Sequence, residues 1–225
     1  MINSSIQCIR LTQFSLTMAL HNPLNILEIS RVAPFPNSPE SASDFSFPLT
    51  FYDTFWLNFP PVERLFFYQL TDSTLLHFNS VIIPKLKHSL SLALLHYLPL
   101  AGKLTWPPHA TKPIVSYSSD DAVTVLVAES HADFNRLSND DIIESPELRH
   151  LIPQLLTSDD KASSMALQIT LFPNQGFCIG ITTHHAIVDG STAITFMKSW
   201  ANLCTKLDKQ DASLLPELTP PLIGW

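Results

Sequence analysis

The sequence is poor in glycine and cysteine, and it has neither a basic run nor a long apolar run. Its five glycines never cluster, which excludes a glycine-rich loop for binding phosphate groups. Its three cysteines, Cys8, Cys178 and Cys204, are too far apart for a disulfide framework or a zinc site. No apolar run reaches the ~18 residues that span a bilayer. With a net charge of -7, these absences predict a cytoplasmic protein that binds neither membranes nor nucleic acid.

The length and composition predict one globular domain with a sizeable core. The chain has 225 residues, of which 45% are hydrophobic and 15% charged. Residues 1–17 contain Arg10 and no acidic residue, and we expect an extension without a structural role, with a targeting segment as the alternative. Residues 18–207 form the predicted domain. Residues 208–225 are first polar and then rich in proline, as in a linker or tail.

The periodicity predicts strands and helices in an order typical of a mixed α/β sheet with flanking helices. The expected strands are 24–32, a central strand at 64–70, a pair at 113–118 and 122–128, and a hairpin at 164–172 and 177–183. A helix begins at Asp72 or Ser73, is kinked or split by Pro84, and ends before Pro99. Residues 33–48 read as a loop, and residues 130–160 contain only short helical stretches.

Two further segments carry many large apolar residues. The last helix is predicted to begin at Ser191 or Thr192 and to turn one set of residues inward: Ile194, Met197, Trp200, Ala201 and Cys204. The segment 51–59 is unusually aromatic. We expect it mainly in the core, while Trp56 is also a candidate for a substrate pocket.

The most informative segment runs from Ile179 to Gly190. An apolar strand leads into the pair His184–His185, and a tight turn then ends in Asp189-Gly190 before the last helix. Successive side chains of a strand point to opposite faces, so only one of the two rings can face a given cleft. The spacing to Asp189 favours His185, and His184 is a secondary candidate for the pocket.

This pattern provides what acyl transfer from a thioester to a hydroxyl requires. Imidazole has an unperturbed pKa of about 6.5, so His185 can remove the hydroxyl proton near neutral pH. Asp189 is better placed to fix the turn than to contact substrate, and Gly190 allows a close approach of backbone or ligand. No covalent intermediate is needed, and so no serine or cysteine nucleophile.

Two other interpretations of the histidines remain open. A histidine at the end of a buried strand is often only a hydrogen-bonded core residue. Metal binding by His184, His185 and Asp189 is not expected, because further ligands at suitable spacing are missing. No such partner spacing is found for six further histidines, which are expected to be solvated or structural: His77, His88, His96, His109, His131 and His150.

The motif His185-Ala186-Ile187-Val188-Asp189-Gly190 resembles the hallmark of the plant BAHD acyltransferases. Three further stretches agree with that family: 48–68, 86–91 and 99–104. The resemblance runs from about Met18 to Pro221, and it is closest to the branch that acts on anthocyanins and phenolic glucosides.

The resemblance implies a fold and an activity. The fold would be that of chloramphenicol acetyltransferase, with the catalytic histidine between two domains. His185 would be the general base and Asp189 a structural residue. The implied reaction transfers a malonyl or hydroxycinnamoyl group from acyl-CoA, a co-substrate rather than a bound cofactor, to a hydroxyl of a phenolic or flavonoid glucoside. Full-length relatives are expected to be monomers.

The sequence departs from the family in length. Members are roughly twice as long, and their second half carries an Asp-Phe-Gly-Trp-Gly motif that this sequence lacks. We therefore expect the N-terminal domain of a truncated product, with weak or no transferase activity alone and an exposed domain interface through which it associates. The alternative is an inactive remnant that binds or interferes with a full-length paralogue. A condensation domain of peptide synthesis is a third reading, disfavoured by stretches 48–68 and 99–104.

Overall fold

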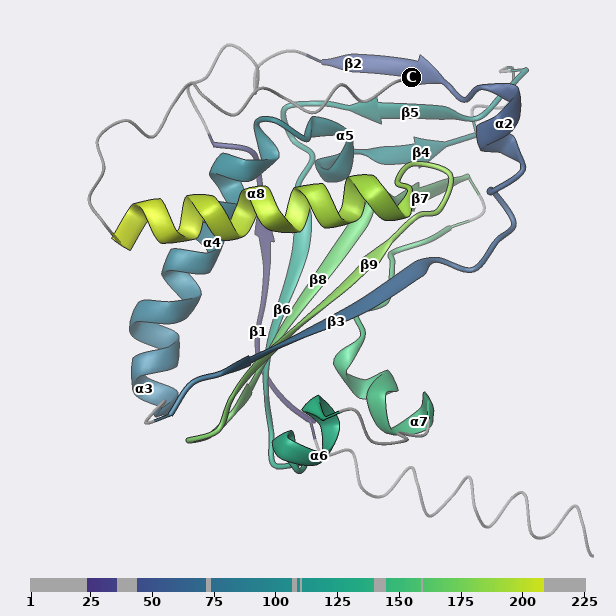
Figure 1. Cartoon of the computed structure of the whole chain (residues 1–225). Helices are drawn as coiled ribbons and strands as arrows, with labels where there is room; N and C mark the ends of the chain where they lie inside the picture. Colours follow the sequence, from purple (N-terminus) through teal and green to yellow (C-terminus); the bar gives the residue numbers. More distant parts are fainter. Residues whose placement is uncertain are drawn as a thin grey trace, which may run out of the picture.

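The computed structural model describes residues 24–35, 44–71, 74–106, 109, 111–139, 145–158 and 160–208. They form two β-sheets and a layer of helices (Figure 1). The predicted extension 1–17 and most of the predicted tail 208–225 lie outside the described residues. The predicted domain boundaries therefore remain predictions.

The larger sheet has five strands in the order β1-β6-β8-β9-β3. The strands are β1 (Leu24–Val32), β6 (Val123–Ser130), β8 (Met165–Phe172), β9 (Gly176–Thr183) and β3 (Val62–Gln69). β6 and β8 run parallel and every other pair is antiparallel. The predicted mixed α/β sheet is thus confirmed.

A smaller antiparallel sheet lies across one end of the larger one (Figure 1). Its strands follow the order β2 (Phe45–Pro48), β5 (Ile114–Tyr117), β4 (Lys103–Thr105) and β7 (Lys161–Ser163). Reading 33–48 as a loop was therefore wrong at its end. The predicted pairing of 113–118 with 122–128 was also wrong, because the turn at Asp120-Asp121 carries the chain from one sheet to the other.

β3 is an edge strand and not the predicted central one. Its continuous apolar pattern has another cause, which is that both of its faces are covered. Phe66 packs against the main core. Leu65 and Phe67 pack on the other face against a small cluster around Phe134 and Phe172. A strand at an edge can therefore read as a buried one.

The hairpin of β8 and β9 forms as predicted and is the most buried part of the sheet. All eight residues of β8 are buried. In the connecting turn Asn174 has a φ of 61°, a left-handed conformation that asparagine tolerates better than most residues. The Gln175 amide donates to the Phe172 carbonyl at 3.0 Å and closes the turn.

The predicted helix around Pro84 is split. α3 (Leu75–His77) begins at Thr74, whose hydroxyl accepts from the His77 amide, while the predicted caps Asp72 and Ser73 lie outside the described residues. A π-helical turn at Phe78–Ile82 leads into α4 (Ile83–Leu94). Pro84 lies in the first turn of α4, where its missing N–H costs least. α4 ends at Leu94, before Pro99 as predicted, and α5 (Leu98–Ala101) follows.

The remaining helices are short, except the last. α2 (Phe51–Thr54), α6 (Phe134–Ser138), α7 (Ser145–Leu148) and a 3₁₀ turn at Arg149–Leu151 connect the strands. α8 (Gly190–Asp208) packs beside α4 on one face of the larger sheet (Figure 1). None of the described helices is long and apolar enough to span a membrane.

The buried stripe of α8 differs from the predicted one. Met197 and Trp200 are buried as expected, and Cys204 is half-buried. Ile194 and Ala201 are exposed, so these two predictions were wrong. The inward face instead follows positions three or four residues apart: Ala193, Phe196, Met197, Trp200 and Leu203.

The Trp200 indole joins α8 to α4 in the core. Its Nε1–H lies 2.9 Å from the Ser89 hydroxyl and 3.2 Å from the Leu86 carbonyl, and the residue is 2% exposed. Replacing Trp200 by Phe removes this donor and leaves a smaller ring in the core, while the Ser89 hydroxyl still donates to the Leu86 carbonyl at 3.1 Å. We therefore expect a loss of about 1–3 kcal/mol in the free energy of unfolding from the lost hydrogen bonds and packing. Urea denaturation measures it. The control is Ala201→Ser on the exposed face of α8, and an equal loss in both variants would contradict this role.

Candidate active site

The candidate site lies where β9 leaves the sheet. The Thr183 position pairs with Val62 of β3 and with Met165 of β8, so neighbours on both sides hold the end of β9. One residue further, the His184 amide donates to the Ser164 carbonyl at 2.9 Å. The chain then turns, because the His184 carbonyl accepts from the amides of Ile187 and Val188 at 3.0 and 3.2 Å.

The His184 ring closes this turn from the inside. Its Nδ1 accepts from the Ala186 amide at 3.2 Å, which places the proton of the neutral ring on Nε2. The residue is only 8% exposed. Burial, and then the neighbouring His185, lowers the pKa of His184, so the ring stays neutral. A neutral ring is what this hydrogen bond needs, since an imidazolium cannot accept from an amide.

His185 lies in a different environment. The residue is half-buried, and its Nδ1 is buried without a hydrogen-bond partner among the described residues. The ring stacks on the Trp56 indole, with 4.2 Å between centroids and 5° between planes. Phe59 approaches the same ring at 6.2 Å and 61°. Trp56 and His185, which are far apart in sequence, are thus brought into direct contact.

The aromatic segment 51–59 carries Trp56 to this position. A reciprocal cap starts α2, in which the Asp53 amide donates to the Thr50 hydroxyl and the Thr50 amide donates to the Asp53 carboxylate. The prediction that this segment lies in the core was wrong. Its aromatic side chains are all exposed by 40% or more: Phe51, Tyr52, Phe55, Trp56 and Phe59. Of these, Trp56 and Phe59 contact the His185 ring, while Phe51 contacts Tyr52 and Phe55.

Asp189 fixes the start of α8. Its carboxylate accepts from the Thr192 amide at 2.7 Å, and its carbonyl accepts from the Ala193 amide at 3.1 Å. The hydrogen bond from the Thr192 backbone, followed by its hydroxyl, holds the pKa of Asp189 below the ordinary value. The side chain itself is exposed. These are the contacts of an N-cap, as a residue that fixes the turn would make.

Gly190 lies against Arg64, a residue that the sequence reasoning did not single out. A Cβ at position 190 would lie 3.0 Å from Nη2 of Arg64, so a glycine leaves room for the guanidinium. Arg64 Nε is buried without a partner among the described residues. An arginine inside the apolar strand 62–67 was a usable signal, because charged residues are rarely buried without a partner or a role.

Several buried polar atoms at this end of the larger sheet have no hydrogen-bond partner among the described residues. They are Arg64 Nε, Ser164 Oγ, Thr183 Oγ1 and His185 Nδ1. Buried polar groups are normally paired, and each orphan costs about 1–3 kcal/mol. Such a concentration at the predicted site is typical of a place where a ligand or another protein segment binds.

The described residues offer little for other chemistries. Among them, no group of three or more His, Cys, Asp or Glu side chains could hold a metal ion. Cys178 is fully buried, and burial raises the pKa of its thiol to about 12. A thiol that is not ionised near neutral pH is a poor nucleophile.

Comparison with known proteins identifies the family of the chain. A model of the Transferase family matches residues 24–217. The chain therefore belongs to this family, that of the BAHD acyltransferases.

The matching relatives include three malonyltransferases of Arabidopsis thaliana. Phenolic glucoside malonyltransferase 1 is 47% identical over 89% of this chain and 42% of that protein. Phenolic glucoside malonyltransferase 2 is 50% identical over 88% and 43%. Malonyl-CoA:anthocyanidin 5-O-glucoside-6''-O-malonyltransferase is 45% identical over 90% and 43%. The chain thus spans about two fifths of the length of these relatives.

Two crystal structures have the same fold. Vinorine synthase superposes with a TM-score of 0.62 at 22% identity, over 80% of this chain and 42% of that one. The F. graminearum TRI101 protein with ethyl coenzyme A gives a TM-score of 0.54 at 14% identity, over 73% and 40%. The expected N-terminal domain of the chloramphenicol acetyltransferase type is confirmed.

The cap at Asp189 predicts a measurable effect on stability. Replacing Asp189 by Ala removes the acceptor for the Thr192 amide and is expected to cost about 1 kcal/mol of unfolding free energy. Asp189→Asn keeps a side-chain oxygen and should retain most of it. Urea titrations of both variants near neutral pH provide the comparison, and equal destabilisation by Ala and Asn would contradict a capping role.

The same residue predicts a pH dependence. The folded-state pKa of Asp189 is depressed, so its stabilisation is present above the unfolded pKa of about 3.9. It is lost as the pH falls through the lower folded-state pKa. The stability difference between the native protein and Asp189→Ala should therefore shrink on acidification. A difference that grows toward low pH would be inconsistent with a depressed pKa.

The stacking of His185 on Trp56 predicts a magnetic effect. The indole ring current shifts protons above its face upfield, so Trp56→Ala should move the His185 ring proton resonances downfield in NMR spectra. Phe55→Ala is the matched control, because Phe55 is an exposed neighbour whose aromatic ring contact is with Phe51. Unchanged His185 shifts in Trp56→Ala would show that the rings do not stack in solution.

Proposed function

We propose that this chain carries the catalytic histidine of an acyl-CoA-dependent O-acyltransferase, with His185 as the general base. The acyl group is malonyl or hydroxycinnamoyl, and the acceptor is a hydroxyl of a phenolic or flavonoid glucoside. The observation that carries the proposal is a half-buried imidazole in the family motif, stacked against Trp56 among buried polar atoms without partners.

The reaction needs one proton transfer in each direction. The His185 imidazole takes the proton of the acceptor hydroxyl while the oxygen attacks the thioester carbonyl carbon. The tetrahedral intermediate collapses, the C–S bond breaks, and the imidazolium gives its proton to the leaving thiolate. Because Nδ1 is buried, Nε2 is the ring nitrogen that exchanges this proton. Acyl-CoA takes part as a co-substrate and no bound cofactor is required.

The other motif residues act through position. Asp189 and the neutral His184 ring fix the turn on either side of His185. Gly190 leaves room for Arg64, which brings a positive charge to the region where negative charge develops during acyl transfer. The roles of Asp189, Gly190 and His184 are thus structural support for the base.

The aromatic segment 51–59 supports an aromatic acceptor. Its exposed rings Trp56 and Phe59 lie beside the imidazole, and aromatic rings stack favourably on one another. An aglycone lying on this surface would place its attached sugar hydroxyl near His185. The malonyltransferase names of the relatives favour malonyl-CoA as the donor.

A second function is supported by the length of the match and by the exposed edge. The chain spans about two fifths of its relatives, β3 has one unpaired edge among the described residues, and the aromatic segment is exposed. Such surfaces favour association. A catalytically inactive form would then bind or interfere with a full-length paralogue. Co-elution with such a relative in size-exclusion chromatography tests this alternative.

Replacing His185 by Ala tests the main proposal. The purified chain is incubated with malonyl-CoA or a hydroxycinnamoyl-CoA and a phenolic glucoside, and release of free coenzyme A is followed with time. Loss of a general base is expected to lower the rate by a factor of about 10²–10⁴. His88→Ala is the matched control, because His88 contacts Phe35 away from the site.

Three outcomes separate the functions. Glucoside-dependent release that His185→Ala abolishes and His88→Ala preserves supports the transferase. Release that persists in His185→Ala contradicts its role as the base. The absence of glucoside-dependent release with every donor contradicts catalysis by this chain and leaves the binding function.

A further inference from the structure

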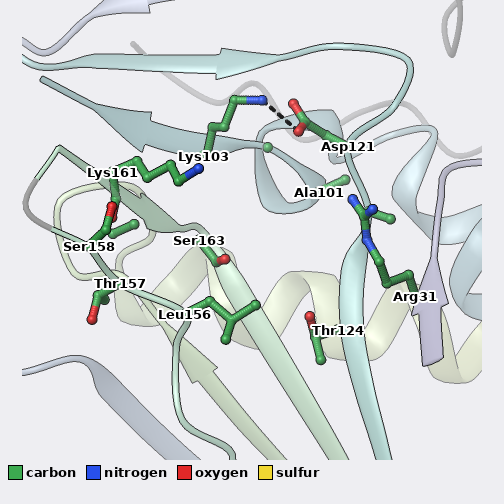
Figure 2. A pocket seen from close by; sticks show the side chains of 13 residues that line it. Arg31, Ala101, Lys103, Asp121, Thr124, Leu156, Thr157, Ser158, Lys161 and Ser163 are labelled. Atoms are coloured by element: carbon green, nitrogen blue, oxygen red, sulfur yellow. Dashed lines mark hydrogen bonds and ion pairs between the residues drawn. The ribbon is translucent and has the colours of Figure 1, made fainter. Parts of the chain in front are cut away.

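A cavity of about 480 Å³ lies between the two sheets, at the side of the larger sheet that carries β1 and β6 (Figure 2). Besides Thr157 and Ser158, its polar lining comes from five segments of the chain. These residues are Arg31 of β1, Thr124 of β6, Lys103 of β4, Asp121 of the turn between the sheets, and Lys161 and Ser163 of β7. The proposed acyl transfer uses none of them.

The cavity is separate from the imidazole but close to it. Thr124 pairs with Ala166 of β8, and Ala166 pairs with Thr182 of β9. Two strand spacings, about 10 Å, therefore separate the cavity wall from the strand that carries the histidines. Ser163 is adjacent to Ser164, whose carbonyl accepts from the His184 amide.

The charged groups in the lining are mostly cationic. Arg31, Lys103 and Lys161 oppose one acidic residue, Asp121. The Lys103 ammonium lies 2.7 Å from the Asp121 carboxylate, whose other oxygen accepts from the Ser118 amide. The single acid is thus neutralised locally. A net charge of two positive units in the described lining contrasts with the net charge of -7 of the whole chain.

Two of the cations retain donors for a ligand. Arg31 uses one N–H to reach the Asp120 carbonyl at 3.0 Å, which orients the guanidinium and leaves its other N–H groups. Lys161 forms no ion pair within the described part of the chain. In Figure 2 the Lys161 and Arg31 side chains lie on opposite sides of the cavity, with the Ser163 and Thr124 hydroxyls between them.

The cavity walls are fixed by backbone hydrogen bonds. The Ser163 amide donates to the Leu156 carbonyl at 2.9 Å, and the Ser158 amide donates to the Lys161 carbonyl at 2.8 Å. At the opposite wall Gly102 approaches β5 so closely that a Cβ would lie 2.2 Å from the Ser116 carbonyl oxygen. A preformed site binds with a smaller entropy loss than one that must be ordered.

From these observations we infer that the cavity binds a small organic dianion between Arg31 and Lys161. Neither Arg31 nor Lys161 is in an ion pair among the described residues, and Asp160, which interacts electrostatically with Lys161, lies outside the lining. Two such positive charges match two negative charges on the ligand. The hydroxyls of Ser163 and Thr124 provide further donors, and Leu156 with Ala101 offers apolar contact for a short carbon skeleton. This inference does not depend on the proposed acyl transfer.

The test is calorimetric titration of the 225-residue chain with malonate and, separately, with inorganic phosphate at low ionic strength. Low salt matters because these cations are partly exposed and salt screens them. We expect saturable binding of one equivalent of malonate. Charge-assisted hydrogen bonds contribute about 1.5–3 kcal/mol, so Lys161→Ala and Arg31→Ala should each raise Kd about tenfold or more.

Two further variants make the result specific. Lys198→Ala removes an exposed lysine of α8 outside the cavity and should leave Kd unchanged. Asp121→Asn removes the one negative charge while keeping an acceptor for the Ser118 amide, and should tighten binding. The inference is contradicted by the absence of saturable malonate binding, by equal weakening in Lys198→Ala and Lys161→Ala, or by phosphate binding alone, which would indicate an inorganic anion site.

Discussion

The hydrogen bonding of β9 along both of its edges is the constraint on which the rest of the structure depends. Its eight residues pair with β8 on one side and with β3 on the other, in registers that end together at Thr183. Central strands with two partners are the most rigid part of a sheet. The histidine pair therefore follows a rigidly held strand end. Only a few residues separate it from the start of α8.

Within that turn, some polar side chains stabilise the backbone and one is available for chemistry. The His184 ring accepts a hydrogen bond from a backbone amide, and the Asp189 carboxylate accepts one from the first turn of α8. The Nδ1 of His185 has no hydrogen-bond partner among the described residues, and the ring stacks on Trp56 from a distant segment. The two adjacent histidines thus have different surroundings: the His184 ring is buried and neutral, and the His185 ring is half-buried and stacked.

Sequence patterns predicted those parts of the fold that depend on residues close together in the sequence. The β8–β9 hairpin followed from strict alternation and a turn sequence. The helical spacing predicted α8, which begins at Gly190 and not at the predicted Ser191 or Thr192. The edge position of β3 could not be predicted, because its apolar faces are covered by segments distant in sequence. The exposure of the aromatic segment 51–59 was missed because large apolar residues are usually buried, and the sequence alone does not show which of them lie at the surface. Arg64 was visible as a charge in an apolar strand, but only its contact with Gly190 places it at the site.

The central claim, that His185 is the reactive base beside an acceptor surface, is tested most directly by chemical labelling without turnover. The 225-residue chain is treated with diethyl pyrocarbonate, and mass spectrometry measures labelling of each histidine with and without a phenolic glucoside. The account predicts that His185 is labelled, that buried His184 resists, and that saturating glucoside slows labelling at His185 but not at exposed His77. Labelling of His185 at the same rate with and without glucoside would contradict it.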